Sequence, residues 1–340
     1  MKTATRTKFT QYTDQIAKLN AIASAVQKFT VTPSVQQTLE KRIQESSEFL
    51  KRITILPVDE LEGEKIGLGV SGTIAGRTNT TADEREPRDV SDLSKGTYKC
   101  AKTDFDTAIP YAKLDAWAKF PEFQSMLRDA ILQQQALDRI MIGFNGTSAA
   151  AATNRAANPL LQDVNIGWIE HVRVDAPARL MSEVVAASDE IRVGKNGDYE
   201  NLDALVYDGI QLLDPVHRRR PDLVVLIGRE LMHDKYLPLI NREQTAENAL
   251  ATDVIISQRR VGGLPAVEVP FIPEGTVIIT CLTNLAIYWQ EGGRRRVILD
   301  NPKRDRIENF ESSNDAYVIE DYGLIAVIEN IELGEWPVVP

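Results

Sequence analysis

The sequence predicts a protein of the α+β class. Residues 121–141 carry apolar side chains at the spacing of one long amphipathic helix. Beyond residue 200, short apolar runs alternate with Gly and Pro, which is typical of antiparallel strands joined by turns. Residues 63–110 favour two strands that have too few large apolar side chains for a core of their own. One long helix, several shorter ones and many strands together indicate the α+β class.

The first 29 residues differ in charge from the rest of the chain. They hold five basic side chains against one acidic side chain, so this segment carries +4 and the remainder −14, for a net charge of −10. Six apolar residues follow a helical stripe: Phe9, Tyr12, Ile16, Leu19, Ala23 and Val26. The segment could be a mitochondrial transit peptide, and it lacks the apolar core of a secretory signal. A short helix that needs a partner to be stable is the better interpretation.

Residues 63–110 are the most informative stretch. Residues 66–74 and 98–109 favour strand, and residues 77–96 between them are polar. No aromatic residue occurs from 51 to 96. A two-stranded hairpin of this composition is marginal in water unless something covers it, and a loop this long is often functional. We therefore expect an arm that folds over a neighbouring subunit, which indicates an assembly protein.

The strongest helix signal follows this arm. Residues 33–50 already predict one helix and residues 53–58 a short strand, but residues 121–141 have the clearer apolar face. Pro121 fits the first helical turn and Gly143 fits the stop. Twenty-one residues span about 32 Å, long enough for a structural spine.

The rest of the chain predicts short elements around a loop at residues 146–157. Helices are expected at 201–213 and 229–236, with a turn at Gly262 and Gly263. The expected strands are 223–227, 254–256, 266–269, 277–280, 285–289, 294–299, 316–320 and 325–329.

Composition excludes several classes of function. The acidic balance argues against binding nucleic acid through a broadly basic surface. The longest apolar runs are too short to span a bilayer. The two cysteines, Cys100 and Cys281, lie far apart and provide neither a disulfide framework nor a metal-site spacing, which favours a reducing compartment.

No motif predicts catalysis. Gly67, Gly69 and Gly72 spell G-x-G-x-x-G, but poor helix propensity after Gly72 favours a glycine-rich strand over a dinucleotide site. No metal-site pattern surrounds any of the three histidines, His171, His217 and His233. We therefore expect no catalytic, cofactor-binding or metal-binding residues and no cofactor.

Two runs of arginine are candidate contact sites. On so acidic a background, ion pairs between subunits are favoured over nucleic-acid contacts. One exposed pair contributes less than about 1 kcal/mol, but many copies of an interface can set its register. The candidate inter-subunit contacts are Arg218, Arg219, Arg220, Arg294, Arg295 and Arg296.

Seven blocks of sequence carry a family resemblance. They are QESSEFLKRI at 44–53, GEKIGLGV at 63–70, IGFNG at 142–146, NPLLQDV at 158–164, DLVVLIGR at 222–229, DVIISQR at 253–259 and NPKRDRIEN at 301–309. In this order they resemble the major capsid proteins of the peduoviruses, the P2-like tailed phages. The resemblance covers nearly the whole chain and is weakest from Trp336 onward.

The resemblance implies the Hong Kong 97-type (HK97-like) phage capsid fold. In that fold an N-arm and a long hairpin, the E-loop, reach over neighbouring subunits, and hexamers and pentamers build an icosahedral head around double-stranded DNA. The implied parts are a segment cleaved on maturation (1–29), the N-arm (30–62), the E-loop (63–110), a peripheral domain with the spine helix (111–200), an axial domain (201–294) and strands returning to the peripheral domain (295–340).

The resemblance also implies processing and partners. A prohead protease would cut near Phe29 and Thr30, and the basic segment before the cut would dock on an acidic internal scaffold. Its loss would leave a lining that does not hold packaged DNA tightly. A portal protein at one vertex is implied as well, with no membrane partner, assembly in the bacterial host cytoplasm and a final location in the virion.

Two alternatives from other classes stay open at this point. A cytoplasmic α+β enzyme would run as a small oligomer, whereas a capsid protein would form rings, shells or polymers. Another structural protein of the same particle, such as a scaffold or a tail-tube subunit, is the second alternative. Scaffolds tend to be more helical, so the strand-rich second half of the chain argues against one.

Overall fold

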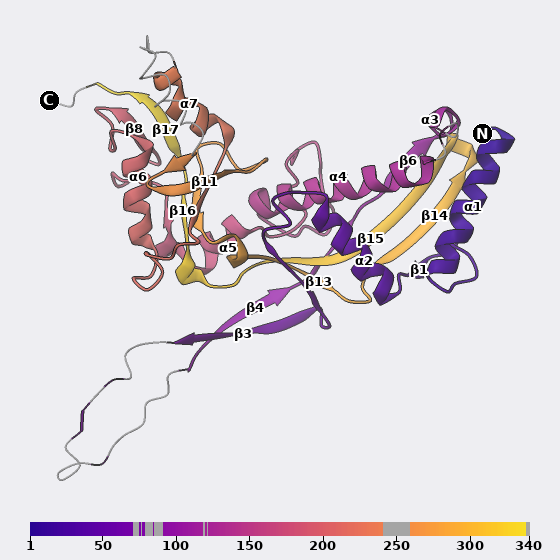
Figure 1. Ribbon diagram of the computed structural model, residues 1–340, viewed down its shortest axis with the longest axis horizontal. Helices are drawn as coiled ribbons and strands as arrows, with labels where there is room; N and C mark the ends of the chain where they lie inside the picture. Colours follow the sequence, from indigo (N-terminus) through magenta and orange to yellow (C-terminus); the bar gives the residue numbers. More distant parts are fainter. Residues whose placement is uncertain are drawn as a thin grey trace.

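The computed structural model describes residues 1–70, 91–117, 122–240 and 259–337, together with residues 75, 77, 78, 84 and 120. Two sheets lie at opposite ends of a long helix, and a hairpin projects from the body between them (Figure 1). The N-terminus lies beside the first sheet and the C-terminus beyond the second, at opposite ends of the molecule.

The first sheet is organised around one long strand, β15 (Arg306–Ile319). Four strands pair antiparallel with it, two along each side: β13 (Leu285–Gln290) and β14 (Arg295–Asn301) on one, β5 (Ala101–Asp104) and β6 (Thr107–Pro110) on the other. At the edge, β2 (Thr54–Val58) pairs with β13 and β1 (Phe29–Thr30) with β14. The strand expected at 316–320 is thus only the end of a strand of 14 residues.

The predicted long helix is confirmed as α4 (Phe123–Asn145). Its buried stripe of Leu132, Ala136, Ile140 and Phe144 packs in the same cluster as the fully buried Trp168. The expected stop at Gly143 is wrong, because the helix continues to Asn145.

Gly143 has a packing role inside this helix. A Cβ atom there would lie 2.3 Å from the Trp168 ring. The Trp168 indole cannot retreat easily, since its Nε1 donates a hydrogen bond of 3.0 Å to the Ala286 carbonyl and its ring meets Phe144 and Tyr317 edge-on.

Replacing this glycine is therefore expected to destabilise the subunit. Gly143→Ala should cost about 1–3 kcal/mol, because overpacking against a buried ring outweighs the better helix propensity of alanine. Urea unfolding of dissociated subunits measures the change. Gln133→Ala, on the exposed side of the same helix, is the matched control, expected within about 0.5 kcal/mol of the parent. Equal midpoints for the two variants would contradict this interpretation of Gly143.

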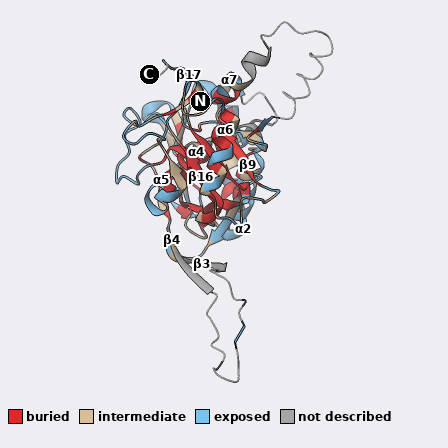
Figure 2. Cartoon of the chain, turned by 90° about the vertical axis from the view of Figure 1, so that its left-hand side faces the viewer, coloured by how far each residue is buried: buried red, intermediate tan, exposed pale blue. Residues whose placement is uncertain are grey.

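The second sheet has six strands among the described residues and is covered on both faces. Its order is β10 (Arg260–Val261), β11 (Leu264–Glu268), β9 (Val224–Ile227), β12 (Val277–Thr280), β16 (Ile325–Ile328) and β7 (Leu180–Met181). One face packs against α6 (Leu202–Gly209) and α7 (Arg229–Ile240), and the other joins the cluster of α4 and α5 (Trp168–Asp175). Every residue of β9, β12 and β16 is consequently buried (Figure 2).

The sequence predicted antiparallel strands, but four of the described strand pairs are parallel. β11 is parallel to β9, β16 to β7, β13 to β2, and β17 (Ile331–Glu335) to β8 (Ile191–Lys195). Long connections through helices or the other sheet make these parallel pairs possible. The expected turn at Gly262 and Gly263 is confirmed: both have positive φ, and they join β10 to β11.

The chain crosses between the sheets more often than the expected boundaries allow. It passes from the second sheet to the first through η3 (Leu282–Asn284) and returns through η5 (Tyr322–Leu324). β13, before residue 294, already lies in the first sheet, whereas β16 and β17 lie outside it. Residues 295–340 therefore do not return to the first sheet as one block.

The basic N-terminal segment forms α1 (Thr3–Leu19), which packs on the first sheet. Phe9, Tyr12 and Ile16 of the predicted stripe join the apolar cluster there. The stripe does not extend to Val26, because the helix ends at Leu19. Leu19 and Val26 are each at least half exposed. Apart from the two strands of the projecting hairpin, the remaining described elements are α2 (Pro33–Glu45), α3 (Tyr111–Trp117), η1 (Pro177–Arg179), η2 (Ile210–Leu212) and η4 (Pro302–Arg304).

Candidate assembly surfaces

The predicted arm is a hairpin of β3 (Glu62–Val70) and β4 (Ser91–Lys99). Its register runs from Glu62 opposite Lys99 to Val70 opposite Ser91, and neither strand pairs with any other described strand. It projects away from both sheets (Figure 1). A two-stranded ribbon is marginal alone, so its geometry favours contact with another chain.

The limits of this arm differ from the sequence prediction. β4 begins at Ser91, inside the stretch expected as a polar loop, and residues 101–110 belong to the first sheet because they pair with β15. Gly67 and Gly69 lie within β3, as predicted for a glycine-rich strand. The strand continues to Val70, so no helix begins directly after Gly69. Gly72 and the strand expected at 254–256 lie outside the described residues.

The base of the hairpin is packed against the first sheet. The rings of Tyr98 and Tyr288 meet edge-on with centroids 5.3 Å apart, and the Cys100 N–H donates to the Leu61 carbonyl at 2.8 Å. A Cβ atom on Gly63 would lie 2.5 Å from the Tyr98 hydroxyl oxygen, so glycine lets the two strands close over the ring. The subunit therefore fixes the base of the hairpin, from which β3 and β4 project.

A buried ionic cluster joins α2 to α4 and to the first sheet. Glu40 of α2 accepts from Arg139 of α4 at 2.5 Å and from Arg294 at 2.6 Å. Arg294 also contacts Glu311 at 2.6 Å, and Arg139 contacts Asp315 at 3.1 Å. All five side chains are at most 4% exposed. Because each charge has at least one opposite partner, the cluster ties three elements together without leaving an uncompensated buried ion.

The carboxylates of this cluster have shifted pKa values. Burial raises the pKa of Glu311, but Arg294 and Arg296 outweigh burial and lower it to about 2. Burial likewise opposes the ionised form of Glu40, while Arg139 and Arg294 bring its pKa below the ordinary value. For Asp315 burial dominates, and the pKa is raised despite Arg139.

Acid should therefore weaken this cluster and lower the stability of the subunit. The pKa of Glu311 falls from 4.5 to about 2 on folding, so its stabilising contribution is complete above pH 4.5 and is lost as the pH falls toward 2. The free energy of unfolding, followed by urea titration of subunits from pH 6 to about pH 3, should decrease over this window. Glu311→Gln should flatten the dependence of this free energy on pH. Glu332→Gln, at an exposed position of β17, should leave that dependence unchanged. Identical slopes in both variants would contradict the assignment.

The six candidate arginines divide into four groups by their exposure. Arg294 is fully buried among residues of its own chain, so its expected role at a subunit surface is wrong in this conformation. Arg296 is largely buried and donates to Asn309 at 2.7 Å and Tyr12 at 3.1 Å. Arg218 and Arg220 are partly exposed, the first bonded to Gln211 and Leu213 and the second to Asp222. Arg219 and Arg295 are exposed, and for them an inter-subunit contact stays a prediction.

The expected processing site lies in a paired strand. Phe29 and Thr30 form β1 and pair with Arg296 and Arg295 of β14. Phe29 is buried in the apolar cluster under α1, while Thr30 is exposed. The next residue, Val31, donates its N–H to the Arg294 carbonyl at 2.9 Å. The bond between residues 29 and 30 is thus at the sheet edge but held in place on both sides.

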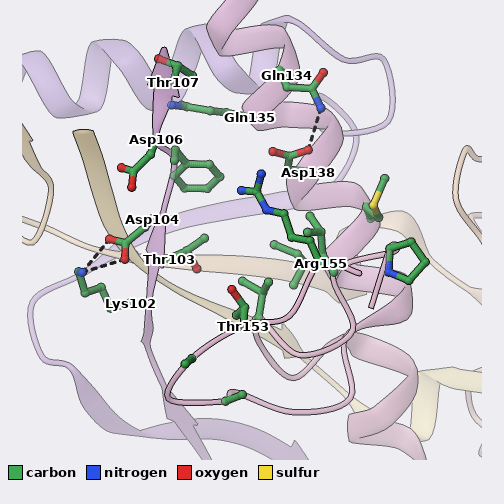
Figure 3. Close-up of a pocket in the computed structure, with 18 of the residues that line it drawn as sticks. Lys102, Thr103, Asp104, Asp106, Thr107, Gln134, Gln135, Asp138, Thr153 and Arg155 are labelled. Atoms are coloured by element: carbon green, nitrogen blue, oxygen red, sulfur yellow. Dashed lines mark hydrogen bonds and ion pairs between the residues drawn. The ribbon is translucent and has the colours of Figure 1, made fainter. Parts of the chain in front are cut away.

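A cleft of about 490 Å³ opens between α4, the strands β5 and β6 and the loop at residues 150–164. Asp138 accepts a hydrogen bond of 2.8 Å from Gln134, and Arg155 points toward it (Figure 3). Burial raises the pKa of Asp138, although Gln134 and Arg155 oppose the rise. Lys102 and Asp104 pair at the rim, 2.7 Å apart. The lining of the cleft therefore carries both positive and negative charges.

The described residues offer no group of three or more His, Cys, Asp or Glu side chains placed to hold a metal ion. His171 pairs with Asp175 and His217 with Asp321, each at 3.0 Å. Both cysteines are buried, and burial raises the thiol pKa to about 12 for Cys100 and about 11 for Cys281. Their thiolates are accordingly scarce near neutral pH.

None of the described helices has the length and apolarity required to cross a membrane.

The ionic cluster was not predicted from the sequence, whereas the arm was. One signal for the cluster was present: Arg139 interrupts the apolar stripe between Ala136 and Ile140 of the predicted helix, where an exposed charge is not expected. The partners Glu40 and Asp315 lie too far away in sequence to be paired with it.

Comparison with known proteins gives consistent matches along the chain. The family model described as phage major capsid protein, P2 family, matches residues 8–331. The chain is 49% identical to "Capsid proteins" of Escherichia phage P2, covering 99% of this chain and 97% of that protein. It is 42% identical to the "Major capsid protein" of Serratia phage KSP20, with 98% and 99% covered.

Solved structures agree with these matches. A chain of the satellite phage P4 procapsid that includes size determination (Sid) protein superposes with a TM-score of 0.82 at 48% identity, covering 98% of this chain and 99% of that chain. A capsid chain of an empty GTA particle superposes with a TM-score of 0.51 at 11% identity, covering 84% and 90%, which is a likeness of fold alone.

Proposed function

The chain belongs to the P2 family of phage major capsid proteins, and we propose on that basis that its copies form the hexamers and pentamers of an icosahedral head around double-stranded DNA. It is a structural protein of the virion, not an enzyme, and has the Hong Kong 97-type capsid fold. The match over residues 8–331 carries this conclusion, and it also decides against the scaffold alternative.

The parts of the fold suggest how a shell would be built. The hairpin of β3 and β4 takes the role of the E-loop, α4 that of the spine helix, the first sheet that of the peripheral domain and the second sheet that of the axial domain. Residues 30–62 take the role of the N-arm. Support for the E-loop assignment comes from a hairpin that projects from the body and pairs with no other described strand.

Partners follow from the same proposal. The basic side chains Arg6, Lys18 and Lys28 are exposed around α1, which suits docking on an acidic internal scaffold. A protease then cuts near Phe29 and Thr30, and a portal protein occupies one vertex. After the cut the remaining chain carries −14, so packaged DNA is held only weakly and without sequence preference. Assembly takes place in the host cytoplasm.

Size and shape of the purified product test the proposal. Expressed with its scaffold and protease, the chain should form shells visible by electron microscopy, and expressed alone it should form rings, shells or polymers. A small monodisperse oligomer under every condition would contradict it. Mass spectrometry of mature particles tests the cleavage separately, because intact residues 1–29 would count against processing and not against shell formation.

A further inference from the structure

The hairpin is anchored at the point where the chain leaves the first sheet for the second. We call Ile319, Glu320 and Asp321 the crossover segment, since they join the end of β15 to η5. Lys65 of β3 donates from Nζ to the carbonyl oxygens of Ile319 and Glu320, and Nζ lies 3.6 Å from Glu320 Oε2. The Lys65 side chain is only 12% exposed. Burial lowers its pKa, although Glu320 opposes that shift.

The second strand of the hairpin reaches the same glutamate. Tyr288 of β13 donates its hydroxyl to Glu320 Oε1 at 2.8 Å, and its ring meets the ring of Tyr98 on β4. Both strands at the hairpin base therefore converge on Glu320, β3 directly through Lys65 and β4 through the Tyr98–Tyr288 contact.

The crossover segment is equally tied on its other side. The buried Asn284 of η3 accepts from the Asp321 N–H at 2.7 Å and donates to the Asp321 carbonyl at 2.9 Å. The Glu320 N–H donates to the Asn284 carbonyl at 2.9 Å. His217, from the loop that follows η2, has its Nε2 atom 3.0 Å from Asp321 Oδ2. The two crossings between the sheets are thus bonded to each other, so a rotation of one sheet against the other must move residues 319–321.

We propose that Lys65 is a positioning residue that sets the angle at which the hairpin leaves the subunit and couples this angle to the angle between the two sheets. An ammonium group suits the position because it donates to two carbonyls at once and places its positive charge 3.6 Å from the Glu320 carboxylate. The use of such coupling rests on the proposed function. In a shell, a change in the angle between the two sheets of one subunit would shift its hairpin against the neighbouring subunit that the hairpin contacts.

Distances between spin labels test the proposal in the full-length chain. One pair, Thr97→Cys on β4 with Gln133→Cys on α4, reports the hairpin angle. A second pair, Gln133→Cys with Val216→Cys, whose native side chain is 78% exposed, reports the angle between the sheets. Dissociated subunits are measured by double electron–electron resonance. Lys65→Met should broaden both distance distributions at least about twofold, because it removes the local anchor.

Matched variants separate positioning from general stability. Lys65→Arg keeps the charge and several donors and should preserve narrow distances. Lys99→Met removes the exposed pair of Lys99 with Glu62 on the same hairpin, 2.5 Å apart, and should leave both distributions unchanged. If Lys65→Met leaves the hairpin distance as narrow as Lys99→Met does, the positioning role is overturned. If it broadens the hairpin distance alone, the coupling is overturned. A chain that forms no shells would refute the proposed function, while these distances would still test Lys65.

Discussion

Subunits in which two glycines replace residues 71–90 are expected to remain folded and to fail to close into shells. The two glycines link Val70 to Ser91, which lie opposite each other in the hairpin register, so the paired strands and their base survive. What is lost is the segment that links the ends of β3 and β4, the two strands that project from the body (Figure 1). The fraction of protein sedimenting as closed shells should fall at least about tenfold, because each subunit loses one of several linked contacts.

Unfolding of the dissociated subunit is the internal control for this deletion. The described contacts of the hairpin with its own subunit lie at its base, around Gly63, Lys65 and Tyr98. The urea midpoint should therefore match that of the parent. Shells of normal number and size, seen by electron microscopy, would mean that the arm is wrongly assigned, whereas a lowered midpoint would mean that the deletion acts through folding.

Glu40→Ala is expected to destabilise the subunit by about 3–5 kcal/mol, the usual cost of removing one partner from a buried ion pair. Glu40 receives hydrogen bonds from both Arg139 and Arg294. Without it the cluster holds two buried guanidiniums with fewer compensating charges, and α2 loses its ionic link to α4. Urea unfolding at neutral pH measures the loss, and limited proteolysis should cut between residues 45 and 54 more rapidly.

Glu45→Ala is the matched control on the same helix. Glu45 is exposed and lies 4.0 Å from Lys41 one turn away, a pair of little energetic weight. Glu40→Gln, which keeps a hydrogen-bond acceptor and removes the charge, should lie between the two variants. Equal unfolding midpoints for Glu40→Ala and Glu45→Ala would show that the cluster does not stabilise α2.

Patterns of local sequence predicted the regular elements well. The helical stripe of α4, the strand at 277–280 and the apolar run of β9 all appear where periodicity and turn residues place them. The hairpin was predicted for a different reason. Its residues are too small and too polar to form a core of their own, so the pattern predicts contact with another chain.

Long-range pairing explains what the sequence could not predict. β15 carries Glu311, Ser312, Ser313 and Asp315 in its middle, and their polarity argues locally against a buried strand. The two carboxylates are buried because arginines pair with them: Arg294, 17 residues away in sequence, with Glu311, and Arg139, 176 residues away, with Asp315. Such compensation is visible only once the strands and helices are placed together.

The burial of both thiols has a consequence for the finished particle. Cys100 is 3% exposed and Cys281 is 1% exposed, and the chain has two cysteines in all. Peroxide and dissolved oxygen attack exposed thiolates, so neither side chain is a ready target for sulfenic acid formation. Heads released from a lysed cell into aerated water should keep both thiols reduced, and their cohesion should be the same with and without added dithiothreitol.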